Sequence, residues 1–185
     1  MDYAAALEQN IKEADQTVMF DEIYESYYKR VYNYISYRIN DHYHTEELVS
    51  RVFEKVLLKL DTYCPGKAPM EVWIITIARN TITDYYRERQ KNQTVSLDTI
   101  VDLFSSRMQP EQIAVANEQN RNLIAALNTL KKRDREIIAM KYAAELRNTD
   151  IARITGLSET NVGAIISRSI RRLRTEMERL DQGGE

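Results

Sequence analysis

The chain contains little of what disulfide-built or turn-rich proteins need. Among its 185 residues are one cysteine, five glycines and three prolines. The single Cys64 cannot form an internal disulfide, which fits a reducing cytoplasm rather than an extracellular domain. The scarcity of glycine and proline favours long uninterrupted helices over tight turns.

Long apolar runs and targeting signals are missing as well. No window approaches the ~18 consecutive apolar residues of a membrane-spanning helix. Residues 1–10 lack the basic-then-apolar pattern of a signal peptide. With 43% hydrophobic and 29% charged residues, the composition is typical of a soluble globular protein. We therefore expect a cytoplasmic protein without membrane insertion.

The sequence also lacks catalytic and metal-binding motifs. The one plausible group of metal ligands consists of His42, His44, Glu46, Glu47 and Cys64, and its spacing matches no common zinc motif. There is no Gly-rich phosphate-binding loop, and no nucleophile is accompanied by an evident base. We therefore expect no enzymatic activity, no cofactor and no metal site.

The distribution of charge is more informative than its total. The net charge of −2 gives no sign of a nucleic-acid partner. The first 25 residues, however, are rich in Asp and Glu, whereas the last helical segment carries Arg168, Arg171, Arg172 and Arg174. Such asymmetry suggests one surface for an anion and another for a basic partner.

Helical spacing extends over almost the whole chain, and period-two alternation is not apparent. Apolar residues recur at three- and four-residue steps over 20–35, 48–60, 74–85 and 123–142. The pattern fades around Pro110. The sequence therefore predicts an all-α protein with two small helical domains, 1–90 and 117–185, joined by a flexible linker over 91–116.

The most specific local pattern is a helix-turn-helix within residues 148–168. Ile151 faces inward on a short first helix, and Gly156 tolerates the positive φ that ends it. Ser158 is a good N-cap for the second helix. This spacing is typical of a DNA-binding motif, although a plain amphipathic helix with a solvated basic face would show similar features.

The second helix of this motif offers two kinds of DNA contact. Its N-terminal end provides free backbone N–H groups and short polar side chains for phosphates and base edges. Its polar face combines small residues with arginines that can neutralise phosphates. The predicted DNA-binding residues here are Ser158, Glu159, Thr160, Asn161, Gly163, Ala164, Ser167, Arg168 and Arg171.

Several segments, in order, resemble the extracytoplasmic-function group of the sigma-70 family of RNA polymerase sigma subunits. Residues 123–142 and the helix-turn-helix resemble the fourth conserved domain of that family. The segments FDEIYESYY (20–28), HTEELVSRVFEKV (44–56) and WIITIARNTITDYYR (73–87) resemble helices of its second domain. The resemblance implies a sigma domain 2-like bundle, a sigma domain 4-like helix-turn-helix, and a role in promoter recognition and transcription initiation.

The resemblance also implies roles for particular residues. The helix within 44–56 would bind the beta-prime clamp of bacterial core RNA polymerase, with Leu48 and Phe53 as apolar anchors, although Phe53 could equally belong to the core. The implied core-polymerase-binding residues are Glu47, Leu48, Ser50, Arg51, Phe53 and Glu54. The implied minus-ten DNA-binding residues, around a base flipped from the nontemplate strand, are Tyr63, Lys67, Arg79, Asn80, Asp84 and Arg87.

The second domain would then bind the polymerase beta flap and the minus-thirty-five promoter element. The sequence departs from the family pattern at Gly163 and Ile165, where Lys and Arg are common, and at Arg147, where a capping Ser is usual. Asn148 or Thr149 would cap that helix instead. Because we expect no regulatory domain after the last helix, the resemblance also implies a separate anti-sigma factor. The alternative function is a helix-turn-helix transcription regulator that acts without polymerase.

Overall fold

The computed structural model describes residues 3–39, 41–92 and 118–182, and these residues form helices without a β-strand. The first domain consists of α1 (Tyr3–Ile39), α2 (His42–Lys59), the 3₁₀ turn η1 (Leu60–Thr62) and α3 (Met70–Asn92). The second consists of α6 (Glu118–Asn128), α7 (Lys132–Ile138), the π-helical turn η2 (Ala139–Ala143), α8 (Asn148–Thr155) and α9 (Glu159–Gln182). The all-α prediction is confirmed. Nearly all of the predicted linker lies outside the described residues.

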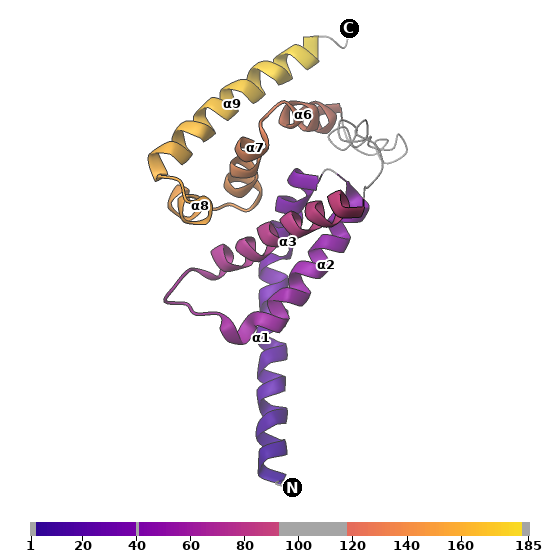
Figure 1. Ribbon diagram of the computed structural model, residues 1–185, viewed down its shortest axis with the longest axis vertical. Coiled ribbons are helices and arrows are strands. Elements are labelled where there is room, and N and C mark those ends of the chain that lie inside the picture. Colours follow the sequence, from indigo (N-terminus) through magenta and orange to yellow (C-terminus); the bar gives the residue numbers. More distant parts are fainter. Residues whose placement is uncertain (1–2, 40, 93–117, 183–185) are drawn as a thin grey trace.

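The first domain is built on the C-terminal half of α1, whose N-terminal half extends beyond the other helices (Figure 1). Both α2 and α3 pack against α1 and against each other. Asp41 caps α2 by accepting a hydrogen bond from the backbone N–H of His44 at 3.0 Å. The fully buried side chains of this core include Val31, Tyr34, Ile35, Leu48, Ile74 and Ile82. Each buried aliphatic side chain stabilises the bundle by roughly 1.5–3 kcal/mol.

The second domain contains the predicted helix-turn-helix, formed by α8 and α9. Gly156 has φ 71° and ends α8, and the Ser158 hydroxyl accepts a hydrogen bond from the backbone N–H of Asn161 at 3.2 Å. Both predictions are thus confirmed. The prediction that Asn148 or Thr149 caps α8 is wrong, because Arg147 occupies the N-cap position without a side-chain cap. Instead Asp150, buried in the first turn, accepts from Arg147 Nε at 3.0 Å.

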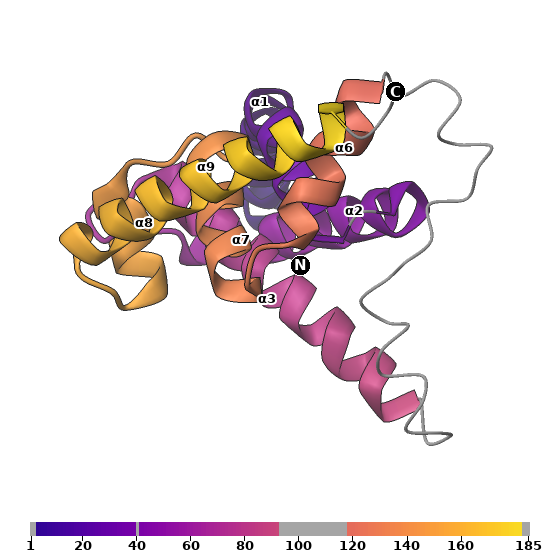
Figure 2. The ribbon, with the colours of Figure 1, turned by 90° about the horizontal axis from the view of Figure 1, so that it is seen from above.

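The two domains pack against each other. In Figures 1 and 2, α7 lies between α3 of the first domain and α9 of the second. Buried residues of both domains belong to one continuous apolar cluster, to which the second domain contributes Met140 of η2, Leu146 of the loop before α8 and Ile151 of α8. Tyr37 of α1 also packs against the second domain's own smaller cluster around Leu127 and Leu173. This arrangement places α7 directly against a helix that carries predicted DNA-binding residues.

Candidate functional site

Two of the predicted polymerase-binding residues on α2 are core residues. Leu48 is fully buried, and Phe53 is only 3% exposed. The Phe53 ring lies among aromatic side chains of α1, with its centroid 4.7 Å from that of Tyr24 and 6.3 Å from that of Tyr28. Because neither side chain offers surface to a partner, the prediction that they are apolar anchors is replaced by a structural role.

A different set of α2 side chains forms the accessible surface. We call it the α2 face, and it comprises Tyr43, Glu46, Glu47, Ser50, Glu54, Leu57 and Leu58. These residues follow one another at three- and four-residue steps, so they lie on one side of the helix. Tyr43 and Leu58 are each 75% exposed at its two ends, and the carboxylates lie between them. The signal that sequence reasoning missed is the pair of adjacent leucines, one of which must leave the buried stripe.

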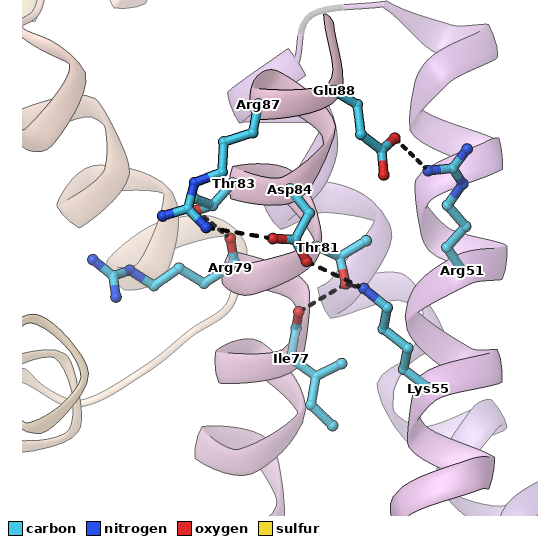
Figure 3. A network of polar contacts seen from close by, with 9 residues as sticks. All are labelled: Arg51, Lys55, Ile77, Arg79, Thr81, Thr83, Asp84, Arg87 and Glu88. Atoms are coloured by element: carbon cyan, nitrogen blue, oxygen red, sulfur yellow. Dashed lines mark hydrogen bonds and ion pairs between the residues drawn. The ribbon is translucent and has the colours of Figure 1, made fainter. Parts of the chain in front are cut away.

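Some of the predicted residues, namely Arg51 of the polymerase-binding set and Asp84 and Arg87 of the minus-ten set, take part in a network of polar contacts between α2 and α3 (Figure 3). Arg51 forms ion pairs with Glu47 at 2.7 Å and Glu88 at 3.3 Å. Asp84 lies 3.6 Å from Lys55 Nζ and 3.8 Å from the Arg87 guanidinium. Beside these pairs is a surface cavity of about 420 Å³, which is lined by Arg51, Glu54, Lys55, Thr81, Asp84, Arg87 and Glu88.

This network is easily rearranged. Its charged side chains are all more than a third exposed, and such pairs contribute about 0–1 kcal/mol each because water screens them. Asp84 is a surface carboxylate that lies between the cations of Lys55 and Arg87. A partner that brings its own charges could therefore displace these pairs at small cost.

The loop between α2 and α3 presents polar groups close to the start of α3. The Tyr63 hydroxyl donates to the Ala68 carbonyl oxygen at 3.2 Å, and the Tyr63 ring packs against Trp73 with centroids 5.2 Å apart. Lys67 and Asn80 are exposed. The Asn80 amide carries both donors and an acceptor, which suits the edge of a base.

Arg79 differs from the other predicted DNA-binding residues of α3 because it is engaged across the domain boundary. Its Nε donates to Glu136 Oε1 of α7 at 2.9 Å, and Arg38 Nη1 of α1 forms an ion pair with the same oxygen at 2.8 Å. Burial raises the pKa of the Glu136 carboxyl, but the two guanidinium groups lower it by more, so its pKa lies below the ordinary value. Nothing in the sequence indicated Arg38 as a partner.

The structure places the predicted minus-thirty-five residues together on one exposed side of α9. Of the nine, all except the half-buried Gly163 are exposed. Beside them runs a groove of about 440 Å³ between α9 and η2. Its lining includes Arg174, which the sequence had indicated as part of the basic helical tail, and adds Lys141 and Tyr142, which sequence reasoning missed. The predicted residues of α9 and the lining of this groove together include four basic side chains, namely Arg168, Arg171, Arg174 and Lys141. The only carboxylate among these residues is that of Glu159.

The described residues give no indication of metal binding, since they contain no group of three or more His, Cys, Asp or Glu side chains that could hold an ion. Over the same residues, no helix is long and apolar enough to cross a membrane.

Comparison with known proteins gives matches along both domains. The family model for sigma-70 region 2 matches residues 23–92, and the model for sigma-70 region 4 matches residues 120–173. The chain is 29% identical over 154 residues to the extracytoplasmic-function (ECF) RNA polymerase sigma factor SigM of Bacillus subtilis, covering 83% of this chain and 92% of SigM. It is 25% identical over 161 residues to the ECF sigma factor BldN of Streptomyces coelicolor, covering 87% of this chain and 61% of BldN.

Among solved structures, the fold resembles that of the sigma factor RpoE in complex with the anti-sigma factor NepR from Bartonella quintana. The TM-score is 0.67 at 23% identity, and the match covers 86% of this chain and 96% of RpoE. At this identity the likeness concerns the fold. None of these matches favours a transcription regulator that acts without polymerase.

Proposed function

Because this chain belongs to the ECF group of the sigma-70 family and is an RNA polymerase sigma factor, we propose that its two domains divide promoter recognition between them. Residues 1–90 bind core polymerase and open the minus-ten element. Residues 117–185 bind the minus-thirty-five element and the polymerase beta flap. The observation that carries this division is the separation of exposed surfaces, with the α2 face and Asn80 on the first domain and the α9 face on the second.

The α2 face is the proposed docking surface for the beta-prime clamp. Its carboxylates, Glu47 and Glu54 among them, favour a basic partner, because opposite charges steer association and fix its register. Leu57 and Leu58 supply the apolar contacts that were first assigned to Leu48 and Phe53. Exposed leucines of this kind lose water-accessible apolar surface when a partner helix covers them.

The proposed minus-ten surface is the loop over residues 63–68 together with the exposed side of α3. Flipping a base out of the duplex costs a few kcal/mol. The Asn80 amide could offset part of this cost by bonding a base edge, and the Lys67 and Arg87 side chains could hold backbone phosphates. These groups are exposed and therefore accessible to a separated strand.

For the minus-thirty-five element, α9 is the proposed recognition helix. Ala164 and Ser167 are small and allow a close approach to the major groove, and Arg168 and Arg171 flank them. Thr160 and Asn161 stand at the helix N-terminus, where side chains reach base edges. Arg174 and Lys141, in the adjacent groove, extend the basic surface.

Two further roles are part of this proposal. The chain acts by binding rather than by catalysis, in the bacterial cytoplasm where polymerase and promoter DNA are found. It binds an anti-sigma factor, as RpoE of Bartonella quintana does in its complex with NepR. Such a partner would cover the surfaces that polymerase and DNA otherwise occupy.

The decisive experiment is transcription in vitro with sigma-free bacterial core polymerase and the promoter upstream of the chain's own gene. We expect transcripts that depend on the protein. Asn80→Ala should abolish most of the transcription while leaving core binding intact, because Asn80 lies away from the α2 face. Ser26→Ala is the control, since Ser26 is exposed on α1 of the same domain and belongs to none of the proposed contact surfaces. Specific duplex binding by the protein alone, without core binding, would refute the proposal.

A further inference from the structure

Two arginines of the first domain converge on one carboxylate of the second. Arg38 at the end of α1 and Arg79 on α3 both contact Glu136 Oε1, at 2.8 and 2.9 Å. The side chains of Arg38 and Glu136 are 15% and 14% exposed, and that of Arg79 is 36% exposed. The Tyr86 hydroxyl donates to the Arg38 carbonyl oxygen at 3.2 Å and thereby fixes the end of α1 beside α3. The first domain thus holds the two guanidinium groups in place from its own helices.

Positive charge is in excess around this carboxylate. Arg135, which precedes Glu136 on α7, is itself largely buried near Tyr86 and Arg38. Burial lowers the pKa of Arg135; the neighbouring Tyr86 raises it, and the charge of Arg38 lowers it again. Glu136 is therefore paired with two guanidinium groups, and a third guanidinium group, that of Arg135, lies near Arg38. Such a concentration of fixed cations attracts anions.

The position of Arg79 links this cluster to the proposed minus-ten surface. Arg79, Thr83 and Arg87 follow at four-residue steps and so lie along one side of α3. Figure 3 shows the Arg79 side chain extending toward the second domain, away from Lys55 and Arg51. Asn80, the proposed base-contacting residue, is adjacent in sequence and exposed. A strand that follows this side of α3 from Asn80 would bring a phosphate close to Arg79.

We propose that Arg38 and Arg79 form a binding site for a backbone phosphate of the nontemplate DNA strand, and that Glu136 occupies this site as an internal competitor while the domains are packed together. The inference rests on the proposed function and adds Arg38 as a DNA-binding residue and Glu136 as a regulatory one. Guanidinium groups bind carboxylate and phosphate oxygens with the same geometry, so one anion can replace the other.

Competition for this site couples DNA binding to domain separation. A phosphate and the Glu136 carboxylate cannot both contact the two guanidinium groups, so strand binding requires α7 to move away. The affinity of the free protein for single-stranded DNA is then reduced by the fraction of molecules in the open state. A partner that draws the second domain away from the first, such as core polymerase, would raise this affinity.

The test is the binding of fluorescein-labelled single-stranded DNA of mixed sequence to the full-length protein, measured by fluorescence anisotropy over a series of salt concentrations. Phosphate contacts are independent of sequence, so no promoter needs to be known. Glu136→Gln keeps the shape of the side chain and removes its charge. Glu145→Gln is the matched control, because it removes a second interdomain ion pair, Arg30–Glu145 at 2.9 Å, without touching the two-arginine site. Circular dichroism verifies that each variant is folded.

We expect Glu136→Gln to bind the DNA about threefold or more tightly than the wild type. The slope of log K against log salt should steepen by about 0.7 for the one phosphate gained. Adding Arg79→Gln or Arg38→Gln to Glu136→Gln should abolish both changes, and Glu145→Gln alone should produce neither.

The inference would be overturned if Glu136→Gln had the same DNA affinity and the same salt dependence as the wild type. It would also be overturned if the gain in affinity persisted after Arg38→Gln or Arg79→Gln was added, or if Glu145→Gln gave the same gain. Absence of any DNA binding by Glu136→Gln at low salt would overturn it as well. Transcription by the wild type with core polymerase, run on the same preparation, reports the proposed function separately. A wild type that supports transcription alongside an inert Glu136→Gln would mean that only the inference fails.

Discussion

Tyr34 gives the sharpest prediction about stability. Its side chain is fully buried at the C-terminal end of α1, yet its hydroxyl has no hydrogen-bond partner among the described residues. Burial raises the pKa of Tyr34 well above the ordinary value, although the Arg38 guanidinium lowers it in part, through its charge and through an approach to the hydroxyl that falls short of a hydrogen bond of good geometry. The hydroxyl therefore remains protonated and unmatched in the core. We predict that Tyr34→Phe stabilises the protein, because phenylalanine keeps the ring packing and removes the unsatisfied group.

The magnitude follows from the cost of an unmatched buried polar group, about 1–3 kcal/mol. Part of this cost is recovered in any small relaxation, so we expect a gain of about 1 kcal/mol in the free energy of unfolding. For a chain of this length the corresponding rise in Tm is about 2–4 °C. Urea denaturation followed by circular dichroism at 222 nm would measure the change as a higher midpoint with an unchanged m value.

Tyr86→Phe is the matched control for this experiment. Tyr86 lies beside the same domain boundary, but its hydroxyl donates to the Arg38 carbonyl oxygen at 3.2 Å. Its removal should therefore destabilise the protein by about 0.5–1.5 kcal/mol. If Tyr34→Phe were instead less stable than the wild type by a similar amount, the Tyr34 hydroxyl would have to be hydrogen-bonded, with Arg38 the nearest donor, and the reasoning would be refuted.

Three further predictions concern the domain boundary, the turn and the polymerase-binding surface. Because the folded-state pKa of Glu136 is lowered, the stability that its carboxylate contributes is present above the ordinary glutamate pKa of about 4.3 and is lost as pH falls through the lower folded-state pKa. The two domains should therefore separate over that pH range, and the efficiency of energy transfer between dyes on native Cys64 and on Glu178→Cys should fall. The fall should be smaller in Glu136→Gln, which has no carboxylate to protonate at this position. Gly156→Ala should cost about 1–2 kcal/mol in urea denaturation, because φ is 71° and the added methyl group meets no neighbour that would add a steric cost; an unchanged midpoint would contradict this. Leu58→Ser should weaken core-polymerase binding in a pull-down without lowering stability, because the side chain is 75% exposed; a loss of stability would show that Leu58 packs against the bundle.

The sequence predicted those features that depend on local chemistry. The turn of the helix-turn-helix follows from Gly156 and Ser158. Gly156 acts through its own backbone conformation, and Ser158 acts through a hydrogen bond to a residue three positions along the chain. The all-α fold follows from helical spacing. These signals require no knowledge of what packs against the segment. They were therefore available before the structure.

The faces of α2 could not be predicted in the same way. Helical spacing shows that Leu48, Phe53, Leu57 and Leu58 cannot all be buried, but it does not show which of them leaves the core. The aromatic cluster contributed by α1 decides this, because Tyr24 and Tyr28 enclose Phe53. A resemblance to a family assigns a helix to a partner. The packing of the neighbouring helix determines which side chains of that helix the partner can reach.

The contacts at the domain boundary could not be predicted from the sequence, because the residues that meet there are far apart in the chain. The kinds of side chain at the boundary explain how the two domains can both associate and separate. Apolar contacts such as those of Tyr37 and Leu146 supply the driving force, since burial is favourable whatever the exact register. The Arg38–Glu136–Arg79 contact adds register, but it contributes little net stability because the ions lose solvation when the domains close. A competing apolar surface could therefore replace the apolar contacts of the boundary. At its charged centre, an incoming phosphate could displace Glu136 from Arg38 and Arg79. The proposed division of promoter recognition requires the two domains to separate, and a boundary of this kind allows that separation.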